Sequence, residues 1–440
     1  MRNQTFTLTN STVLTMDEKD SFYPDGAIVV EKNRIKAVGS ADTIEPVGEV
    51  FDMGGALIMP GLINTHTHSH SSIFRNQADD LRLMEWLETA MWPMEKRLSH
   101  ERAYAATALS SLEYLKGGIT TYADQFYYAD TIAKAASKSG IRCVLGATVF
   151  TNPSPETSDT MQAAVDFIEK WRGKESVTLV YPAIGPHAPY SVSAELFREI
   201  SDLAGKYNLL IHTHISETAE ENADIQERFG CSPAQWLDSL GIMENKVLAA
   251  HCVHLSESDM DLFAAKNLSV SYNPVSNLKL VSGLMDYKRM SARGITIGIG
   301  TDGAQSNNSM DLLRDMRTGA LIQKQSVGDA AFFTAREAVR MMTIEGAKAL
   351  FMGDDIGSLE CGKLADIIAL NPKSPRLCPL HRDSIKSLYA ALAYSVCGAD
   401  VTDVIVDGKW VLRQQTAVRF DETEVLENAQ AASDYLIGKS

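Results

Sequence analysis

Two histidines two positions apart end an apolar run in the stretch NTHTH, as His66 and His68. In a β-strand, residues i and i+2 point to the same face, so both rings can reach one metal ion. Taken alone, such a pair is more often a hydrogen-bonded pair of core or surface histidines. His214 and Asp302, however, end other apolar runs of the chain. Three imidazoles and one carboxylate suit a borderline divalent cation such as zinc, with a coordination position left for water.

The stretch HTHISE carries a second histidine pair, His212 and His214, followed by Glu217. Both histidines share one strand face, so spacing does not choose between them as ligands. We expect His214 to bind the metal because it lies nearer the strand end, where Glu217 can reach over the metal from the loop. A carboxylate there can move protons between metal-bound water and a substrate nitrogen. The alternative is that Glu217 helps to start a helix together with Ser216 and Thr218.

Two further histidines follow apolar runs. His251 ends KVLAAHC and is a candidate to hydrogen-bond the metal-bound water or to support its ligands. His187 lies in IGPHAPYS, where two prolines stiffen the loop, and this suits a residue that contacts substrate. The alternative for His187 is a histidine that braces the loop.

The stretch GIGTDG spells G-x-G-x-x-G with Gly298, Gly300 and Gly303. A dinucleotide site needs a following helix, another strand and an acidic residue about 20 positions on. Two successive helical segments follow instead, and Gln323 stands near the required position. We therefore expect the glycines to permit a tight exit turn, and Asp302 to bind the metal and take a proton from water.

Eight apolar, β-rich runs separated by segments of helical periodicity must position these residues. They are ALIMPGLINTH, GITTYAD, RCVLGATVF, VTLVYPAIG, NLLIHTH, KVLAAHC, LSVSYNP and TIGIGTD. This alternation predicts an α/β fold, a (β/α)8 TIM barrel with buried parallel strands. Such barrels carry their active sites at the carboxyl ends of the strands. Those ends are His66 and His68, Asp124, Thr151 and Asn152, His187, His214, His251, Asn273 and Asp302.

Short strands with hairpin signals occupy both ends of the chain. Residues 5–58 contain a hairpin tip at Glu31-Lys32-Asn33, and the C-terminal part contains another at Asp407-Gly408. Neither set can close a core alone, so we expect one small β-sandwich assembled from both ends. The expected domains are residues 1–58 for its N-terminal part, 59–355 for the barrel, and 356–440 for its C-terminal part plus a terminal helix.

Composition restricts the class of partner. The net charge of −15 disfavours nucleic acid or an anionic membrane surface. The N-terminus lacks the apolar core of a signal peptide, and no run of about 18 apolar residues occurs. We therefore expect a cytoplasmic protein.

The six cysteines form no C-x-x-C pair, so neither a thiolate zinc site nor a disulfide framework is indicated. H-E-x-x-H, Walker and G-x-S-x-G motifs are also absent, which leaves metal-assisted hydrolysis in a barrel.

Several motifs together resemble the amidohydrolase superfamily, and more narrowly its methylthioadenosine and S-adenosylhomocysteine deaminase branch. They are PGLINTHTH, IHTHISET, LAAHCVHLS, NPVSNLKLVSG and GIGTDGAQSNN, and the similarity covers nearly the whole chain. The resemblance implies that one zinc per subunit is bound, with Fe2+ or Mn2+ as alternatives. Its ligands would be His66, His68, His214 and Asp302, while Glu217 would shuttle protons and His251 would assist the attacking water.

The resemblance also implies substrate contacts. The segment ADDLRLMEWLE is similar to a stretch whose glutamate, here Glu85, contacts ribose hydroxyls, and we expect Glu85 and Trp86 to belong to a lid. His187 matches a substrate-binding histidine. The family usually places an arginine after the third strand, yet VFTNPSPETSD contains none.

The implied reaction is hydrolytic removal of the 6-amino group of an adenine nucleoside, giving the inosine product and ammonia. Substrates would be 5′-methylthioadenosine, S-adenosylhomocysteine or a related 5′-modified adenosine. The alternative enzyme is an amino- or chloro-hydrolase of a triazine, pterin, guanine or 8-oxoguanine. A non-enzymatic assembly protein is disfavoured because every expected ligand is retained. We expect a small-molecule nucleoside as partner and a homo-oligomer.

Overall fold

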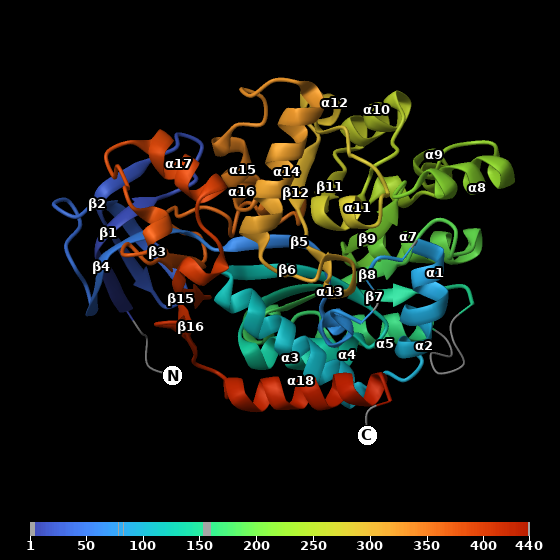
Figure 1. Cartoon of the computed structure of the whole chain (residues 1–440), viewed down its shortest axis with the longest axis horizontal. Coiled ribbons are helices and arrows are strands. Elements are labelled where there is room, and N and C mark those ends of the chain that lie inside the picture. The colour runs from blue at the N-terminus through green and yellow to red at the C-terminus, as the bar shows by residue number, and fades with distance from the viewer. Residues whose placement is uncertain (1–4, 78, 82, 153–159, 439–440) are drawn as a thin grey trace. The chain divides into compact units, whose positions relative to one another are not determined.

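The computed structural model describes residues 5–77, 79–81, 83–152 and 160–438 (Figure 1). The chain divides into two compact units. The first comprises Met1–Asn64, Leu112–Thr121 and Asp311–Phe420, and the second comprises Thr65–Ser111, Tyr122–Met310 and Asp421–Ser440.

Eight parallel strands form a closed barrel, which confirms the predicted TIM-barrel fold. In barrel order they are β5 (Leu62–His68), β6 (Ile119–Phe126), β7 (Arg142–Val149), β8 (Val180–Pro186), β9 (Leu210–Ile215), β10 (Lys246–His251), β11 (Ser269–Tyr272) and β12 (Thr296–Ile299). β12 pairs back to β5, as does the short extension β13 (Asp302–Gly303). Every residue of β6, β7, β9 and β11 is buried, which explains why these runs are mostly apolar or small.

Helices alternate with the barrel strands as their periodicity predicts (Figure 1). Those between β5 and β12 are α1 (Leu83–Trp86), α2 (Trp92–Glu95), α3 (His100–Lys116), α4 (Ala129–Ser139), α5 (Thr160–Trp171), α6 (Glu175–Thr178), α7 (Ala194–Tyr207), α8 (Ala219–Phe229), α9 (Pro233–Ser239), α10 (Glu257–Lys266), α11 (Pro274–Lys279) and α12 (Tyr287–Ala292). Those after the last barrel strand are α13 (Ala304–Asn307), α14 (Leu312–Val327), α15 (Ala335–Met341), α16 (Ile344–Ala349), α17 (Ile385–Tyr394) and α18 (Glu422–Leu436).

Helix α7 shows how the sequence sets these elements. The Ser193 hydroxyl caps its first turn by accepting a hydrogen bond from the Leu196 backbone N–H. Phe197, Ile200 and Ala204 recur at helical spacing and are all buried, so they form the face that packs inward. Each barrel helix of this kind brings the next strand back in the same direction, and all strand ends meet at one rim.

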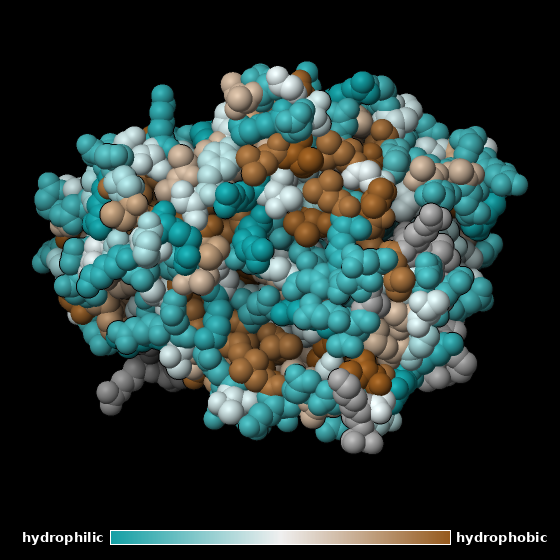
Figure 2. Space-filling view, viewed as in Figure 1, coloured by the Kyte–Doolittle hydropathy of each residue, from teal (hydrophilic) through white to brown (hydrophobic). Residues whose placement is uncertain are grey.

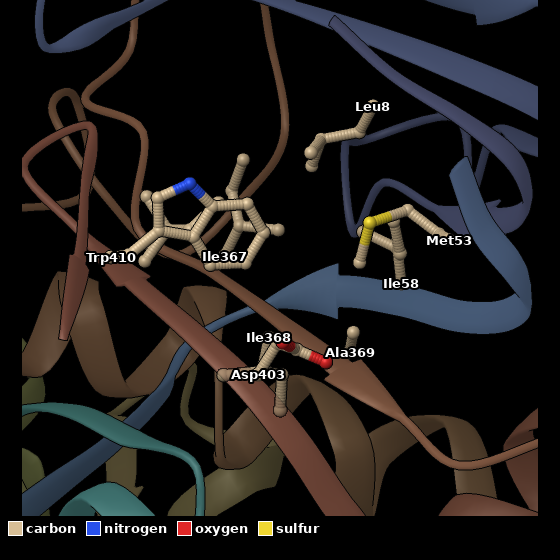
Figure 3. A pocket seen from close by; sticks show the side chains of 9 residues that line it. Leu8, Met53, Ile58, Ile367, Ile368, Ala369, Asp403 and Trp410 are labelled. Atoms are coloured by element: carbon tan, nitrogen blue, oxygen red, sulfur yellow. The ribbon is translucent and has the colours of Figure 1, made fainter. Parts of the chain in front are cut away.

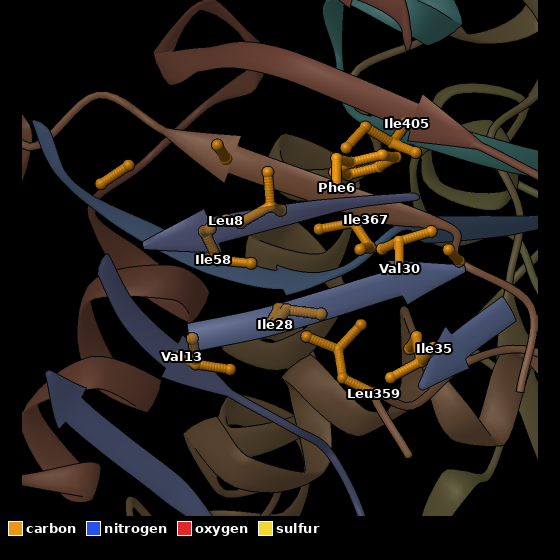
Figure 4. Close-up of a cluster of buried hydrophobic side chains, with 13 residues drawn as sticks. Phe6, Leu8, Val13, Ile28, Val30, Ile35, Ile58, Leu359, Ile367 and Ile405 are labelled. Carbon is orange, nitrogen blue, oxygen red and sulfur yellow. The ribbon is translucent and has the colours of Figure 1, made fainter. Parts of the chain in front are cut away.

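The strands from both chain ends form one eight-stranded mixed sheet, which confirms that the two ends build one β unit. Its order is β17 (Thr416–Ala417), β16 (Lys409–Arg413), β15 (Val401–Val406), β14 (Ile367–Leu370), β4 (Glu49–Pro60), β1 (Thr5–Leu14), β2 (Phe22–Glu31) and β3 (Arg34–Ser40). Figure 4 shows its core, in which Phe6, Ile28 and Ile58 pack with Ile367 and Ile405 from the other end of the chain.

Both predicted hairpin turns are present in this sheet. Lys32 adopts a φ of 60°, and Asp407 and Gly408 adopt φ values of 51° and 70°. A Cβ on Gly408 would lie 2.3 Å from the Lys32 carbonyl oxygen, so this position requires glycine.

A small pocket in this sheet is lined mainly by aliphatic side chains and by Trp410 (Figure 3). Asp403 is its one acidic residue, so it offers no cluster for catalysis.

Helix α18 belongs to the second unit. The Ser433 hydroxyl donates to the Ile73 carbonyl at 2.7 Å, and the Arg102 guanidinium lies 3.4 Å from the centre of the Tyr435 ring.

Figure 2 shows hydrophilic residues over most of the viewed face. Within the described ranges, no helix has both the length and the apolar composition needed to cross a bilayer.

Candidate active site

Four histidines at strand ends each have their Nδ1 atom held by a neighbouring group. The pairs are His66 with His212 Nε2 at 2.8 Å, His68 with the Gln125 carbonyl at 3.0 Å, His214 with the His187 carbonyl at 2.7 Å, and His251 with the Asn277 side-chain oxygen at 2.8 Å. Because Nδ1 is engaged in each ring, Nε2 is the nitrogen left to face the barrel mouth. This arrangement is typical of histidines that bind a metal through Nε2.

The structure brings the four predicted metal ligands together. His66, His68 and His214 form one group whose ligand atoms all lie within 4.8 Å of one another, and His66, His251 and Asp302 form a second. Asp302 Oδ1 lies 3.4 Å from His66 Nε2 and 3.5 Å from His68 Nε2. His66, His68, His214 and Asp302 can therefore form a metal site. Three imidazoles and one carboxylate fit zinc well.

Asp302 is held in a fixed orientation. Its Oδ2 atom accepts hydrogen bonds from Ser276 Oγ at 2.6 Å and from Ser306 Oγ at 2.9 Å, which directs Oδ1 toward the histidines.

A Cβ on Gly300 would lie 2.5 Å from the Asn273 side chain and 2.7 Å from the His66 carbonyl. Gly300 is therefore required for close packing beside the site, and no dinucleotide cradle is needed to explain it.

Glu217 lies in the loop after β9, where its carboxylate is 3.7 Å from His251 Nε2. The preceding residue, Ser216, adopts a φ of 52°, which is uncommon for a residue with a side chain. The buried Glu221 carboxylate accepts the backbone N–H groups of Ser216 at 2.9 Å and Glu217 at 2.8 Å. Thr218, rather than Glu217, caps helix α8. The Glu217 side chain is therefore available for chemistry.

Burial controls the protonation of this cluster. It lowers the pKa of His66 to about 4 and that of His214 well below its ordinary value. Both rings are therefore neutral near pH 7, the form that binds a metal. Burial also raises the pKa of Glu217, which suits a group that must donate a proton. Burial alone would lower the pKa of His251, but the Glu217 and Asp302 carboxylates outweigh it and raise that pKa.

His187 is adjacent to the cluster, with its ring centre 5.0 Å from that of His214. Its Nδ1 is 2.9 Å from Ser191 Oγ, and burial together with His68 and His66 lowers its pKa to about 3. The sequence did not indicate that its backbone carbonyl also orients His214.

The predicted lid residues lie in α1. Glu85 is exposed and Trp86 is buried. Among the described residues, neither side chain makes a hydrogen bond or ring contact with the histidine cluster, so their role in substrate binding stays a prediction. Part of VFTNPSPETSD, residues 153–159, lies outside the described residues, as does any contact that it makes.

Sequence reasoning assigned no role to His70, which lies beside His68, or to Glu95, which lies beside His70. The His70 ring is buried with its centre 6.0 Å from that of His68, and it stacks on Phe126. His70 Nε2 lies 4.0 Å from the Glu95 carboxylate, and burial raises the pKa of Glu95 to about 7. Glu95 follows Glu85 by ten positions, and the sequence offered no means of choosing between these acids.

The fold and the site agree with comparisons to known proteins. The amidohydrolase family model matches residues 57–411, so the chain belongs to the amidohydrolase family. The chain is 37% identical to the 5-methylthioadenosine/S-adenosylhomocysteine deaminase of Pelotomaculum thermopropionicum and 37% identical to the 5'-deoxyadenosine deaminase of Methanosarcina mazei. Each alignment covers 98% of both chains. The structure of an adenosine deaminase from Xanthomonas campestris with bound zinc superposes with a TM-score of 0.93, at 32% identity over 98% of each chain.

Proposed function

We propose that this chain is a zinc-dependent hydrolytic deaminase of adenine nucleosides, including 5′-methylthioadenosine, S-adenosylhomocysteine and related 5′-modified adenosines. The observation that carries the proposal is the position of Glu217, a partly buried carboxylate 3.7 Å from His251 at the rim that holds the four metal-ligand candidates. A hydrolase that adds water to a ring carbon needs this combination of a metal site and a separate proton carrier. The names of the relatives support the adenine nucleoside as substrate.

A zinc ion bound by His66, His68, His214 and Asp302 would supply a Lewis acid that lowers the pKa of water to near neutrality. Asp302 accepts a proton from the attacking water while Ser276 and Ser306 hold its other oxygen. His251 orients the water oxygen toward C6 of the purine, because Asn277 fixes its ring.

Glu217 donates a proton to the ring nitrogen next to C6, so that the ring accepts the new C–O bond. The resulting tetrahedral carbon carries both the hydroxyl and the amino group. Glu217 recovers a proton from this hydroxyl, and the proton held by Asp302 passes to the amino group. The C–N bond then breaks, ammonia leaves, and the inosine-type product keeps the water oxygen.

His187 is the best supported of the three predicted substrate contacts, because its ring lies beside His214. Glu85 and Trp86 stay part of the proposal as lid residues. His70, which lies close to His68, and Glu95, which lies beside His70, are further candidates to contact a polar part of the substrate. The homo-oligomer expected from the sequence also stays a prediction.

Ammonia release and metal content of the purified protein test this proposal. We expect turnover on methylthioadenosine, S-adenosylhomocysteine, adenosine or 5′-deoxyadenosine, with one zinc per chain. Turnover confined to guanine or a triazine would overturn the assignment of substrate. Glu217→Gln should retain zinc but lose about 2 to 4 orders of magnitude in turnover, whereas Glu220→Gln on the exposed side of the same turn should not. Near-normal turnover of Glu217→Gln would exclude Glu217 as the proton carrier.

A further inference from the structure

His212 precedes His214 by two residues on β9, so it lies on the same face of the strand and deeper in the barrel. Its side chain is fully buried, and its Nε2 atom is 2.8 Å from Nδ1 of the ligand candidate His66. The Asp124 backbone faces the same ring. The groups that can bind one metal in the described part of the chain do not include His212. It therefore contacts a metal ligand without being one.

The bond between these two rings can be made in two ways. A neutral imidazole carries one N–H and one lone pair, so either His66 donates to His212 or His212 donates to His66. Only the first arrangement leaves a lone pair on His66 Nε2, the atom that lies 3.4 Å from Asp302 Oδ1. The second arrangement would place a hydrogen on Nε2 and prevent it from binding a metal.

The other two histidine ligand candidates do not share this ambiguity. His68 and His214 donate to backbone carbonyls, which accept hydrogen bonds but cannot donate them. Their tautomers are therefore fixed by the fold. His66 depends instead on a side chain whose own proton can sit on either nitrogen.

We propose that His212 is a positioning residue that holds His66 in its Nδ1-protonated form and so directs the Nε2 lone pair of His66 to the metal. His212 then carries its own proton on Nδ1, on the side of the Asp124 backbone. The proposal rests on the proposed function only in requiring that His66 binds the metal.

Two conservative variants separate this role from simple packing. In His212→Gln the amide oxygen reaches the place of the imidazole Nε2 and can still accept from His66. In His212→Asn the amide is one carbon shorter and reaches only the place of Nδ1. We expect zinc affinity, measured by competition with a chromophoric chelator, to fall about 10- to 100-fold in His212→Asn and to stay close to that of the unchanged protein in His212→Gln. Equal affinities in the two variants would overturn the proposal.

A ligand role for His212 gives a different result. If His212 bound the metal, His212→Asn would bind no zinc even at saturating concentration, as we expect for His214→Asn. That outcome would overturn the proposal. Thermal melting of each metal-free variant identifies any loss of affinity that follows from misfolding.

Nitrogen-15 NMR of the unchanged, zinc-loaded protein gives a test that reads the proton position directly and uses a variant only to assign the signal. With 15N-labelled histidine, and His212 assigned by the signal missing from His212→Gln, we expect a pyrrole-type shift at Nδ1 and a pyridine-type shift at Nε2 of His212. Protonation at Nε2 would overturn the proposal. Because this measurement involves no substrate, a protein that binds zinc but deaminates nothing would overturn the proposed function and leave the role of His212 standing.

Discussion

Replacing Glu221 by alanine tests whether this carboxylate holds the catalytic loop. The substitution removes the acceptor of two backbone N–H groups, those of Ser216 and Glu217. An unpaired buried donor costs about 1–3 kcal/mol, so the native state should lose about 2–6 kcal/mol unless water or a loop movement replaces the bonds. If the loop moves to recover one amide, Glu217 leaves its position beside His251. Restoring that position would cost about 1–3 kcal/mol, which corresponds to a turnover about 5- to 150-fold lower.

The matched control is Glu220→Ala, which removes the same charge from the same helical turn at an exposed position. We expect Glu221→Ala, but not Glu220→Ala, to lower both the free energy of unfolding in urea and the turnover number. Zinc content should stay unchanged, because Glu221 contacts none of the ligand candidates. Two variants that matched in unfolding and in turnover would refute the argument that Glu221 positions the loop.

Three further outcomes follow from the same geometry. Ser276→Ala should lower zinc affinity about 10- to 100-fold in a chelator competition, because Asp302 Oδ2 loses one of its two hydroxyl donors. Unchanged affinity would show that Ser276 does not orient Asp302 for metal binding. The native state keeps the Glu95 proton to about pH 7, whereas the unfolded chain releases it near 4.5. Glu95 should therefore contribute a fall of at most about 3 kcal/mol in the free energy of unfolding as pH rises through this window, measured in urea titrations at stepped pH as the difference between the unchanged protein and Glu95→Gln. Chelation should abolish turnover and lower the melting temperature, and added zinc should restore both; full activity after chelation would contradict a metal mechanism.

The sequence predicted the barrel and placed the metal-ligand candidates at one rim for a physical reason. Strands buried on both faces are nearly continuous apolar runs, so their ends are easy to locate. Parallel strands connected by helices end at one rim, so groups far apart in the sequence, such as His66 and Asp302, can be placed together without any contact information. The alternation of side chains along a strand then explains why His66 and His68 face the same side.

The same reasoning fails where two residues have equal spacing or where the partner is a backbone group. His212 and His214 share one strand face, and only depth within the barrel separates them. Glu221 could have been found, because Thr218 followed three residues later by a glutamate is the pattern of a helix start. Its bonds to two loop amides depend on the left-handed turn at Ser216, which no local pattern indicates.

The partners of the four Nδ1 atoms explain why His66, alone among the three histidine ligand candidates, needs a side chain to orient it. His68 on β5 uses the carbonyl of Gln125 on β6, the neighbouring strand, and His214 on β9 uses the carbonyl that follows β8. His251 on β10 uses Asn277, which follows its neighbour β11. The bond from His66 to His212 instead joins β5 to β9, four strands away in the order of the barrel.

That bond therefore crosses the barrel interior from one strand to the opposite one. A side chain with an acceptor must span the gap, and His212 Nε2 does so from the opposite strand. Substitutions that shift β9 relative to β5 should consequently weaken metal binding through His66 before they affect His68, whose partner moves with its own strand pair. Small-to-large substitutions in the barrel core test this order when the nitrogen-15 shifts of His66 and His68 are followed in the zinc-loaded variants, because zinc affinity alone does not show which ligand is lost.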